Sequence, residues 1–582
     1  MIFLSAQPDD FYFSWQLEVQ LTNFRNLGIP RNKIHVLIAF DPSRGLDKAF
    51  QDLMVGFRDY CLFFAYPDQR LQNSYLSSIR PHIIKQHFEH FPDLSDEVIF
   101  YHDSDIIFRE LPHWERLCID NTIYLSRTVD YLDVRYILSG ADDQLLSAMS
   151  RVVGIPVETI YQYDQQVGGA QYLLKKVNTG FWEKVERDSE ALFVLIEQYN
   201  DKRKSLGLNE AALQRATVDA WYADMWGVLW NLWLYGMNTA THPELDFCWA
   251  HNHTSEWHRT KILHYTGNIP KNDKLKFRKG NYCHHSPFFD SDIKMVSSET
   301  CGYQVVLEIE KIVGSSKGRR YDLRDVTFLI PLRIDSESRA ENIDIICRYL
   351  TKYFDTNIMI MESDSVSKFD ASFVNNEVKY FFDLNASPAF HRTKINNFLI
   401  GKAQTPFIVL YDTDVILPVD QIIDSVKILR DGDASLVLPY SGEFLSVDLL
   451  FKAIFAKILE SDLLVMNKGK FKSSGERCCG GAVFLNKMDY LLAGMENEYF
   501  TSWGPEDIER VKRVKNLGMK VSRVPGSLYH LSHDRLENSS YGNGKRELFL
   551  EEYLKICDLD RTDLQEYIDG WPWVRKLPVA NN

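Results

Sequence analysis

The chain has 582 residues, of which 45% are hydrophobic and 25% charged, and its formal net charge is −14. This length exceeds that of an ordinary single domain, so roughly two to four domains with sizeable cores are expected. The negative charge argues against a nucleic-acid binder, because a surface that follows phosphates needs clustered Lys and Arg. It is compatible with a nucleotide-sugar ligand, whose diphosphate can be held by one metal ion and a few local cations.

The nine cysteines show no CxxC pairs and no regular framework, which is typical of free thiols in a reducing compartment. The opening MIFLSAQPDD lacks a basic segment, so no secretory signal is expected. No window approaches the roughly eighteen apolar residues of a transmembrane helix. We therefore expect a cytoplasmic protein, either free or at the inner face of the membrane, with at most peripheral membrane contact.

The first segment alternates strand and helix signals. Ile2 to Ser5 and Ile34 to Phe40 are predicted strands, and Trp15 to Leu27 is a predicted helix that ends at Gly28. This rhythm predicts a mostly parallel sheet with a binding crevice at the strand ends. A further predicted helix, IRPHIIKQHFEHF, precedes the next strand.

That next strand ends in two acids. Residues 98–108 read VIFYHDSDIIF, with Asp103 and Asp105 directly after an apolar run. Alternate residues of a strand point the same way, so both carboxylates can converge on one hard cation. The alternative is an ordinary acidic turn, since Asp is common in turns.

Three later signals belong to the same half. Gly168 and Gly169 lead a predicted strand, where a ligand or another backbone can come close. Asp224 lies in a tryptophan-rich stretch, which we interpret as core apart from that acid. His264 lies in the apolar segment ILHYTG; a lone histidine there more often packs in a core, but the upstream acidic pair favours a metal ligand.

The order of these elements resembles that of retaining, metal-dependent glycosyltransferases of the glycogenin-like family 8. The segments that carry the resemblance are Asp103-Ser104-Asp105, Gly168-Gly169, Asp224 and His264-Tyr265-Thr266-Gly267, followed by Lys271. The resemblance implies metal ligation by Asp103, Asp105 and His264, a nucleotide contact at Arg80 and a diphosphate contact at Lys271. Lys271 stands one residue later than the family's spacing, and Lys274 is the alternative.

The pattern weakens after residue 277. Cys283-His284-His285 has no second pair of ligands at metal-site spacing and is interpreted as structural. The run GSSKGRR at 314–320, rich in Gly, Ser and basic residues, is typical of a linker. The expected organisation is a domain at 1–285, a linker region at 286–320 and a domain at 321–582.

The second half repeats the first pattern. A predicted strand begins at Val326, and Phe407 to Val415 reads FIVLYDTDV, an apolar strand that ends in Asp412 and Asp414. The turn after the first strand is similar to the opening of inverting glycosyltransferases of families 2 and 7, in which it holds the uridine end of the donor. The residues concerned are Arg333, Asp335, Arg339 and Asn342.

Three later segments resemble β-1,4-galactosyltransferases and chondroitin-polymerase-like enzymes. They are Gly480-Gly481-Ala482-Val483-Phe484, Trp503-Gly504-Pro505-Glu506-Asp507 and His530-Leu531-Ser532-His533-Asp534. The resemblance implies that Asp507 is the catalytic base and that Glu506 orients the acceptor. It implies donor contacts at Trp503 and Asp412, and metal ligation by Asp412, Asp414, His530 and His533. Pro-Glu-Asp also suits the first turn of a helix, and the two interpretations are compatible.

These patterns predict an α/β protein with two Rossmann-like GT-A domains in tandem. The expected function is transfer of sugars from UDP-sugars with Mn²⁺ or Mg²⁺, with one α-linkage from the N-terminal half and one β-linkage from the C-terminal half. Asp224 and Asp507 are the expected catalytic acids of the two halves. The acceptor is expected to be a glycan, a glycolipid or a glycoprotein. Two alternatives stay open: one active domain beside a degenerate one, or a carbohydrate-binding scaffold without activity.

Overall fold

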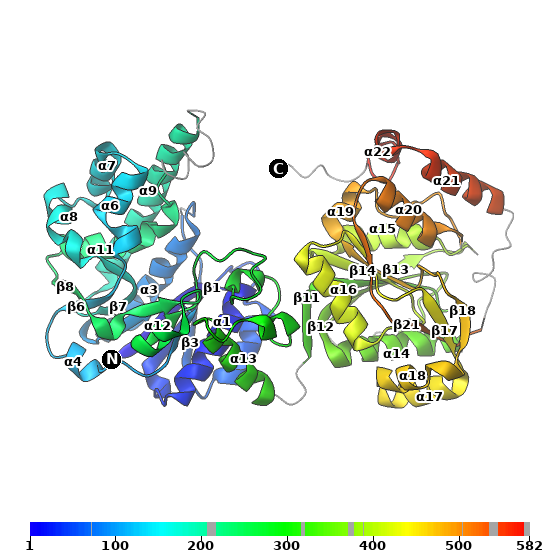
Figure 1. Ribbon diagram of the computed structural model, residues 1–582, viewed down its shortest axis with the longest axis horizontal. Helices are drawn as coiled ribbons and strands as arrows, with labels where there is room; N and C mark the ends of the chain where they lie inside the picture. The colour runs from blue at the N-terminus through cyan, green and yellow to red at the C-terminus, as the bar shows by residue number, and fades with distance from the viewer. Residues whose placement is uncertain are drawn as a thin grey trace. The chain divides into compact units, whose positions relative to one another are not determined.

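The structure is a computed structural model of residues 1–582, and it describes all of them except residues 72, 206–216, 316–319, 371–376, 388, 503, 535–544 and 576–582. The chain divides into two compact units, Met1–Gly318 and Arg319–Asn582, each with its own sheets and helices (Figure 1). All nine cysteines are free thiols. Within the described residues, no helix is both long enough and apolar enough to span a bilayer.

The first unit is built on a seven-stranded sheet of order β3-β2-β1-β4-β7-β6-β8. The strand β1 runs parallel to β2 and β4, and β7 runs antiparallel to β4 and β6. The strands β1 and β2 are apolar along almost their whole length because helices cover both faces of the sheet. The strands are β1 Ile2–Pro8, β2 Ile34–Phe40, β3 Leu62–Pro67, β4 Ile99–His102, β6 Ile123–Arg127, β7 Gly168–Leu174 and β8 Thr239–Thr241.

Helices pack on both faces of this sheet. One core includes Ile83 of α3, Trp182 of α9 and Trp226 of α11, so the tryptophan-rich stretch is core, as expected. The other includes Leu21 of α1 and Phe50 of α2. The α-helices are α1 Phe11–Asn26, α2 Lys48–Phe57, α3 Ile79–His90, α4 Trp114–Leu117, α5 Val129–Leu132, α6 Val134–Gly140, α7 Asp143–Val153, α8 Val157–Tyr163, α9 Thr179–Lys204, α11 Ala223–Leu234, α12 Thr254–Arg259 and α13 Tyr303–Ser315.

A small second sheet closes the end of the acidic strand. It has the order β5-β10-β9, with β5 at Ile106–Phe108, β10 at Ile262–His264 and β9 at Phe247–Trp249. His264 lies opposite Ile106, and the Tyr265 amide donates to the Asp105 carbonyl at 3.0 Å. This pairing carries the late histidine to the acidic pair.

Most of the segment expected as a linker, 286–320, belongs to the first unit. The helix α13 packs on α1, and Val305, Val306 and Ile309 are buried in a shared core. The helical part of this segment is amphipathic, and burial of its apolar face offsets the conformational entropy that is lost when it folds. The division between the units falls between Gly318 and Arg319, within the run GSSKGRR that was expected to be a linker.

The second unit repeats the architecture. Its seven-stranded sheet has the order β13-β12-β11-β14-β19-β16-β20, and the strand directions match those of the first sheet position by position. The strands are β11 Tyr321–Leu332, β12 Phe354–Asp364, β13 Val378–Leu384, β14 Phe407–Tyr411, β16 Leu436–Leu438, β19 Ala482–Asn486 and β20 Val521–Arg523. The helices are α14 Glu337–Tyr353, α15 Arg392–Lys402, α16 Val419–Asp431, α17 Leu449–Ile458, α18 Ser461–Met466, α19 Lys487–Leu492, α20 Glu506–Asn516, α21 Arg546–Asp558 and α22 Arg561–Asp569.

The second unit also has a small sheet, of order β15-β21-β17-β18. Val415 lies opposite His530, and the Leu531 amide donates to the Asp414 carbonyl at 2.7 Å. The strands are β15 Val415–Ile416, β17 Glu443–Val447, β18 Lys472–Gly475 and β21 Ser527–Leu531. The predicted α/β fold class is confirmed, and the chain has two α/β units in tandem with matching sheets.

Candidate active sites

The first unit brings together three groups that can hold a metal ion. One ligand atom each from Asp103, Asp105 and His264 lies within 4.8 Å of the others. His264 Nε2 is 3.1 Å from Asp105 Oδ1 and 3.7 Å from Asp103 Oδ2. Two carboxylates and an imidazole suit a divalent cation such as Mn²⁺. The residues present therefore fit the metal site that the sequence predicts.

Asp105 carries the strongest electrostatic perturbation of this group. Burial would raise its pKa, but the charges of His264 and Lys279 outweigh burial and hold the pKa below its ordinary value. Lys279 donates directly to Asp105 Oδ2. Asp105 is therefore held as a carboxylate, the form that ligates a metal.

The lysine at this site differs from the one expected. Lys271 is exposed and does not line the cavity beside the acidic pair. The alternative, Lys274, pairs with Asp292 at 3.0 Å. Lys279, further along the loop after β10, lines the cavity instead. The spacing between histidine and lysine in the glycogenin-like family did not indicate Lys279.

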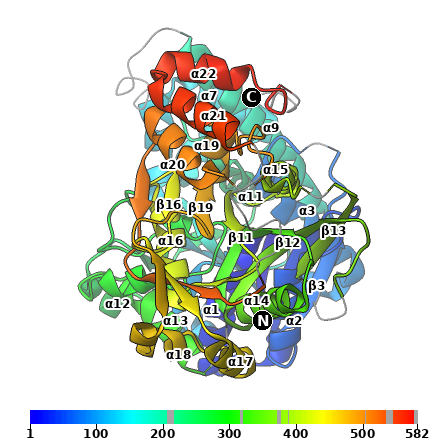
Figure 2. The same ribbon diagram turned by 90° about the vertical axis from the view of Figure 1, so that its right-hand side faces the viewer.

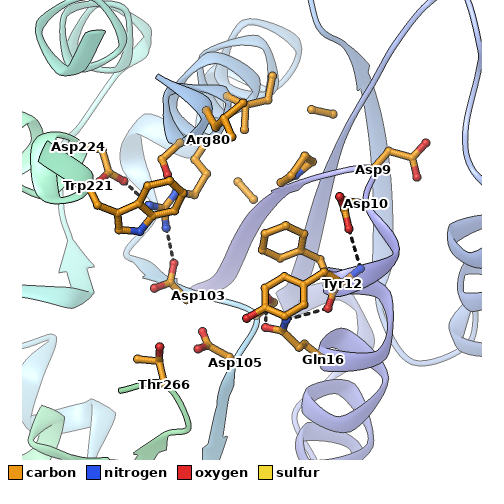
Figure 3. A pocket seen from close by; sticks show the side chains of 18 of the residues that line it. Asp9, Asp10, Tyr12, Gln16, Arg80, Asp103, Asp105, Trp221, Asp224 and Thr266 are labelled. Atoms are coloured by element: carbon orange, nitrogen blue, oxygen red, sulfur yellow. Dashed lines mark hydrogen bonds and ion pairs between the residues drawn. The ribbon is translucent and has the colours of Figure 1, made fainter. Parts of the chain in front are cut away.

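Arg80 bridges two acids of the first site (Figure 3). Its Nη1 lies 2.5 Å from Asp103 Oδ1, and its Nη2 lies 2.5 Å from Asp224 Oδ2. The Tyr75 hydroxyl donates to the other oxygen, Asp224 Oδ1, at 2.7 Å. Burial raises the pKa of Asp224, against the opposing charge of Arg80. Both oxygens of this carboxylate are therefore engaged.

A cavity of about 1460 Å³ opens over these residues. Arg80, Asp103, Asp105 and Asp224 line it, and Figure 3 shows Arg80 between Asp103 and Asp224, with Asp105 beside Asp103. Its far rim carries Asp9, Asp10 and Tyr12. The volume exceeds the few hundred Å³ of an ordinary ligand pocket and is sufficient for a nucleotide-sugar.

The predicted glycine pair does not line this cavity. A Cβ on Gly168 would lie 2.5 Å from Leu125 Cβ, and one on Gly169 would lie 2.6 Å from Met225 Cε. What comes close to these glycines is therefore the neighbouring strand β6 and helix α11, rather than a ligand. The next residue, Ala170, lines the cavity at a φ of 63°.

The second unit forms a corresponding group. One ligand atom each from Asp414, His530 and His533 lies within 4.8 Å of the others. His533 Nε2 is 3.1 Å from Asp414 Oδ2, and His530 Nε2 is 3.7 Å from Asp414 Oδ1. Burial would raise the pKa of Asp414, but hydrogen bonding from His533 and the charges of His530 and Arg339 lower it. This donor set also fits a divalent cation.

Asp412 stands apart from that group. Both of its oxygens accept from Arg392 Nη1, at 3.0 and 3.1 Å. Burial and the nearby Asp414 raise the pKa of Asp412, although Arg392 opposes them. In this structure the first aspartate of each acidic pair thus forms an ion pair with an arginine: Asp412 with Arg392, and Asp103 with Arg80.

Arg392 also reaches the predicted catalytic acids. Its Nη2 lies 2.7 Å from Glu506 Oε1 and 3.0 Å from Asp507 Oδ1. Arg510 adds a second contact to Asp507 Oδ1, at 3.1 Å. Burial would raise the pKa of Asp507, but these two guanidinium groups lower it, whereas burial raises the pKa of Glu506.

The two acids differ in access. The Glu506 side chain is 4% exposed, and Glu506 Oε2 accepts from the Gly504 amide at 2.8 Å, whereas Asp507 is 25% exposed. Among the described residues, none donates a hydrogen bond to Asp507 Oδ2. Glu506 is thus placed to hold Arg392 and the turn, and its expected contact with an acceptor stays a prediction.

Gly480 gives Asp507 its room. A Cβ at Gly480 would lie 2.3 Å from Asp507 Oδ2 and 3.1 Å from its Cγ. Gly481 has a φ of +87°, in the left-handed region that favours glycine. Gly480 therefore makes room for a side chain of the site, whereas Gly168 and Gly169 make room for neighbouring structural elements.

The predicted donor-binding turn is ordered by its own contacts. Arg333 donates to the Ser363 carbonyl at 2.8 Å and the Ser387 carbonyl at 3.1 Å. Arg339 joins Asp335, at 3.1 Å, to Asp414, at 3.4 Å. Arg339 is therefore at the metal group, whereas Arg333 braces the loops beside it. Trp503 lies outside the described residues.

The two sites are built alike. Arg80 is the second residue of α3 and Arg392 the first of α15, and each bridges the first acid of its pair to an acid in the first turn of another helix. Those acids, Asp224 and Asp507, are each the second residue of their helix. Arg392 and Arg510 were not predicted. The signal for Arg392 was an arginine at the start of the helix before the acidic strand in both halves, 23 residues before Asp103 and 20 residues before Asp412.

Comparison with known proteins matches one segment of the chain. Residues 463–534 match a family model described as the N-terminal domain of galactosyltransferase. The matched segment includes Gly480, Asp507 and the two histidines of the second site. The C-terminal unit is therefore of the glycosyltransferase class. No curated protein sequence gives a significant match.

Three solved structures show weaker likeness. The catalytic domain of Drosophila β-1,4-galactosyltransferase 7 with xylobiose is 14% identical, with a TM-score of 0.26, over 39% of this chain and 79% of that chain. GalNAc-T7 with UDP, GalNAc and Mn²⁺ is 13% identical, with a TM-score of 0.29, over 44% of this chain and 52% of that chain. Glucosyl-3-phosphoglycerate synthase from Mycobacterium tuberculosis, with Mn²⁺, UDP and phosphoglyceric acid, is 14% identical, with a TM-score of 0.26, over 41% of this chain and 80% of that chain. These likenesses are too weak to assign a function.

Proposed function

We propose that the chain carries two metal-dependent glycosyl-transfer centres that use UDP-sugars. The C-terminal centre makes a β-linkage with inversion, and the N-terminal centre makes an α-linkage with retention. One contrast carries the proposal: Asp507 Oδ2 accepts no hydrogen bond from any described residue, whereas both oxygens of Asp224, at the corresponding helix position, are engaged.

An inverting transfer needs a carboxylate beside the incoming hydroxyl. Arg392 and Arg510 fix Asp507 through Oδ1, which leaves Oδ2 to accept the proton of the acceptor hydroxyl. The hydroxyl oxygen then bonds to the anomeric carbon as the bond to the diphosphate oxygen breaks. The galactosyltransferase match around Asp507 supports this assignment.

The N-terminal centre is arranged for positioning rather than for proton removal. Tyr75 and Arg80 hold both oxygens of Asp224, so this acid orients Arg80 beside the cavity. A transfer with retention requires no base at the position of Asp224 for its first displacement. The order of motifs, similar to that of the retaining family 8, supports the same assignment.

The residues that would hold a cation are Asp103, Asp105 and His264 in the first centre and Asp414, His530 and His533 in the second. A divalent cation, when bound there, neutralises charge on the departing diphosphate. Mn²⁺ suits the mixed oxygen and nitrogen donors, and Mg²⁺ is the alternative. Lys279 and Arg339, each at the second acid of its pair, supply local positive charge for the diphosphate.

The acceptor is proposed to be a glycan, a glycolipid or a glycoprotein. The two alternatives are one active unit beside a degenerate one, and a non-catalytic scaffold. Both complete metal groups speak against degeneration of either unit. A binding scaffold has no need for an open carboxylate such as Asp507.

The test is donor screening with Asp105→Ala and Asp414→Ala variants of the full chain. A panel of UDP-sugars is offered with and without Mn²⁺, and product anomers are assigned by NMR. The first variant is expected to lose only the α-linked product and the second only the β-linked one. Loss of both products in either variant means one composite site. No Mn²⁺-dependent turnover by the wild-type chain favours the scaffold.

A further inference from the structure

The helix α17 exposes an apolar face. Leu449, Leu450, Ile454 and Ile458 are 71%, 67%, 37% and 42% exposed. Their spacing puts them on one side of the helix. The opposite side packs into the core through Phe455, which is fully buried. The helix is thus apolar on both sides, and only one side is covered.

The end of α18 extends this face. Val465 is 42% exposed and Met466 is 85% exposed. The helices α17 and α18 contact one another and lie side by side at one end of the second unit (Figures 1 and 2). We call the set Leu449, Leu450, Ile454, Ile458, Val465 and Met466 the α17–α18 face. Single exposed apolar residues are normal in soluble proteins, but six on two helices that contact one another favour an interaction site.

Lysines border this face. Lys468, Lys470 and Lys472 follow Met466 within a few residues and are exposed, and residues 463–472 contain no acid. Lys468 pairs with Glu443 at 3.0 Å, which leaves Lys470 and Lys472 as the lysines that can face an anionic surface. The acids at the helix ends are largely engaged elsewhere: Asp448 caps α17 through the Phe451 amide, and Glu460 pairs with Lys352 at 2.6 Å. Asp462, in the first turn of α18, is exposed. In a chain of net charge −14, Lys470 and Lys472 therefore give the face a positive border at the end of α18 that bears Met466.

The inner side of α17 touches the second metal group. The Lys452 side chain is 2% exposed, and its Nζ donates to the Ser532 carbonyl at 3.2 Å. Ser532 lies between His530 and His533. Lys452 also pairs with Glu341 Oε2 of α14 at 2.8 Å, so α17 is anchored both to α14 and, through the Ser532 carbonyl, to the segment between the two histidines. Whatever covers the outer side of α17 is therefore separated from the segment with the histidines by the width of this helix.

We propose that the α17–α18 face docks on an anionic membrane surface and that the acceptor of the C-terminal centre is carried on a lipid. Apolar side chains enter the boundary between headgroups and acyl chains, while bordering lysines pair with anionic headgroups. The lipid-borne acceptor rests on the proposed function; the docking itself does not. A second copy of the chain and another protein are the other possible occupants.

The test measures sedimentation of the full chain with phosphatidylcholine vesicles, with and without phosphatidylglycerol. The wild-type chain is expected to bind the anionic vesicles more tightly, and added NaCl is expected to weaken binding. Leu450→Ser with Met466→Ser should weaken it by about tenfold or more, because two apolar anchors are lost. Leu548→Ser with Leu554→Ser is the matched control, since these residues of α21 are 62% and 49% exposed. The control should bind like wild type.

Two outcomes overturn the docking proposal: the wild-type chain does not sediment with anionic vesicles, or the Leu450 and Met466 variant binds as well as wild type. A dimer that this variant abolishes, without vesicle binding, assigns the face to a second copy instead. Turnover on a water-soluble acceptor should be unchanged in the variant, and turnover on a vesicle-borne acceptor should fall. Vesicle binding without any transfer by the wild-type chain rejects the proposed function and leaves the docking intact.

Discussion

His264 and His530 occupy the same place in the two units. Each lies, across an antiparallel strand pair, opposite the residue that follows the second aspartate of its acidic pair. In each unit the amide one residue later donates to the carbonyl of that aspartate. The shared register fixes one imidazole beside one carboxylate in both units, whereas His533 is an addition of the second.

Removing these histidines should separate the two metal groups. His264→Ala is expected to weaken Mn²⁺ binding at the first group by roughly 10- to 100-fold and leave the second unchanged. His530→Ala should do the reverse, with a smaller loss because His533 remains. Mn²⁺ titration followed by electron paramagnetic resonance can resolve the two classes of site. Equal loss at both sites in either variant contradicts independent groups.

Asp507→Asn tests the base. The variant keeps the shape of the side chain but cannot accept the proton, so turnover on the β-linked product should fall by about 10² to 10⁴. UDP and Mn²⁺ binding, measured by calorimetry, should be retained. A variant with near-normal turnover removes Asp507 from the mechanism. Formation of the α-linked product serves as the internal control.

The acidic pairs and late histidines were predictable because each lies at the end of a local apolar strand. Lys279 was not, because it reaches Asp105 from 174 residues away through a loop whose course the sequence does not specify. The glycine pair at 168 and 169 was misjudged for a related reason. A glycine in a strand signals close approach, but the pattern is the same whether a ligand or a neighbouring side chain approaches.

The domain pattern shows the same limit. The restart of strand and helix signals at Val326 predicted two units, and the division lies nearby. A short helix at Val305 to Val313 was predicted inside the linker region, but nothing in its sequence shows that α13 packs on the distant helix α1 and so belongs to the first unit. Local propensity predicts that a helix forms, whereas long-range packing decides which unit it joins.

Buried histidines should make the chain sensitive to acid. His35 Nδ1 lies 2.9 Å from His87 Nε2, and burial lowers the pKa of His35 to about 4 and that of His87 to about 3. Above the ordinary pKa of about 6.5, both histidines are neutral in the folded and unfolded chains, so their protonation does not change the free energy of unfolding. Below it, only the unfolded chain gains protons, so stability falls with pH until the folded pKa is reached.

The expected loss is about 1.4 kcal/mol per histidine for each pH unit between about 6.5 and 4. It is measured as the free energy of unfolding of the full chain, by denaturant titration at several pH values. His35→Gln with His87→Gln should flatten this dependence. His258→Gln, on the outer helix α12, is the control and should leave it unchanged. An equally steep dependence in the double variant assigns the acid sensitivity to other groups.

Gly480→Ala tests whether the open oxygen of Asp507 depends on the glycine. The added Cβ would lie 2.3 Å from Asp507 Oδ2, closer than any side chain tolerates, so the carboxylate must turn away from its place beside Arg392 and Arg510. Overpacking of this kind costs roughly 1 to 3 kcal/mol of stability.

Because Oδ2 is the proposed proton acceptor, the turnover number should fall by about tenfold or more while KM for the UDP-sugar changes little. Gly401→Ala is the matched control, since a Cβ there meets nothing within 4 Å, and it should leave turnover unchanged. Normal turnover in Gly480→Ala, with the fold intact, shows that the base works from another position.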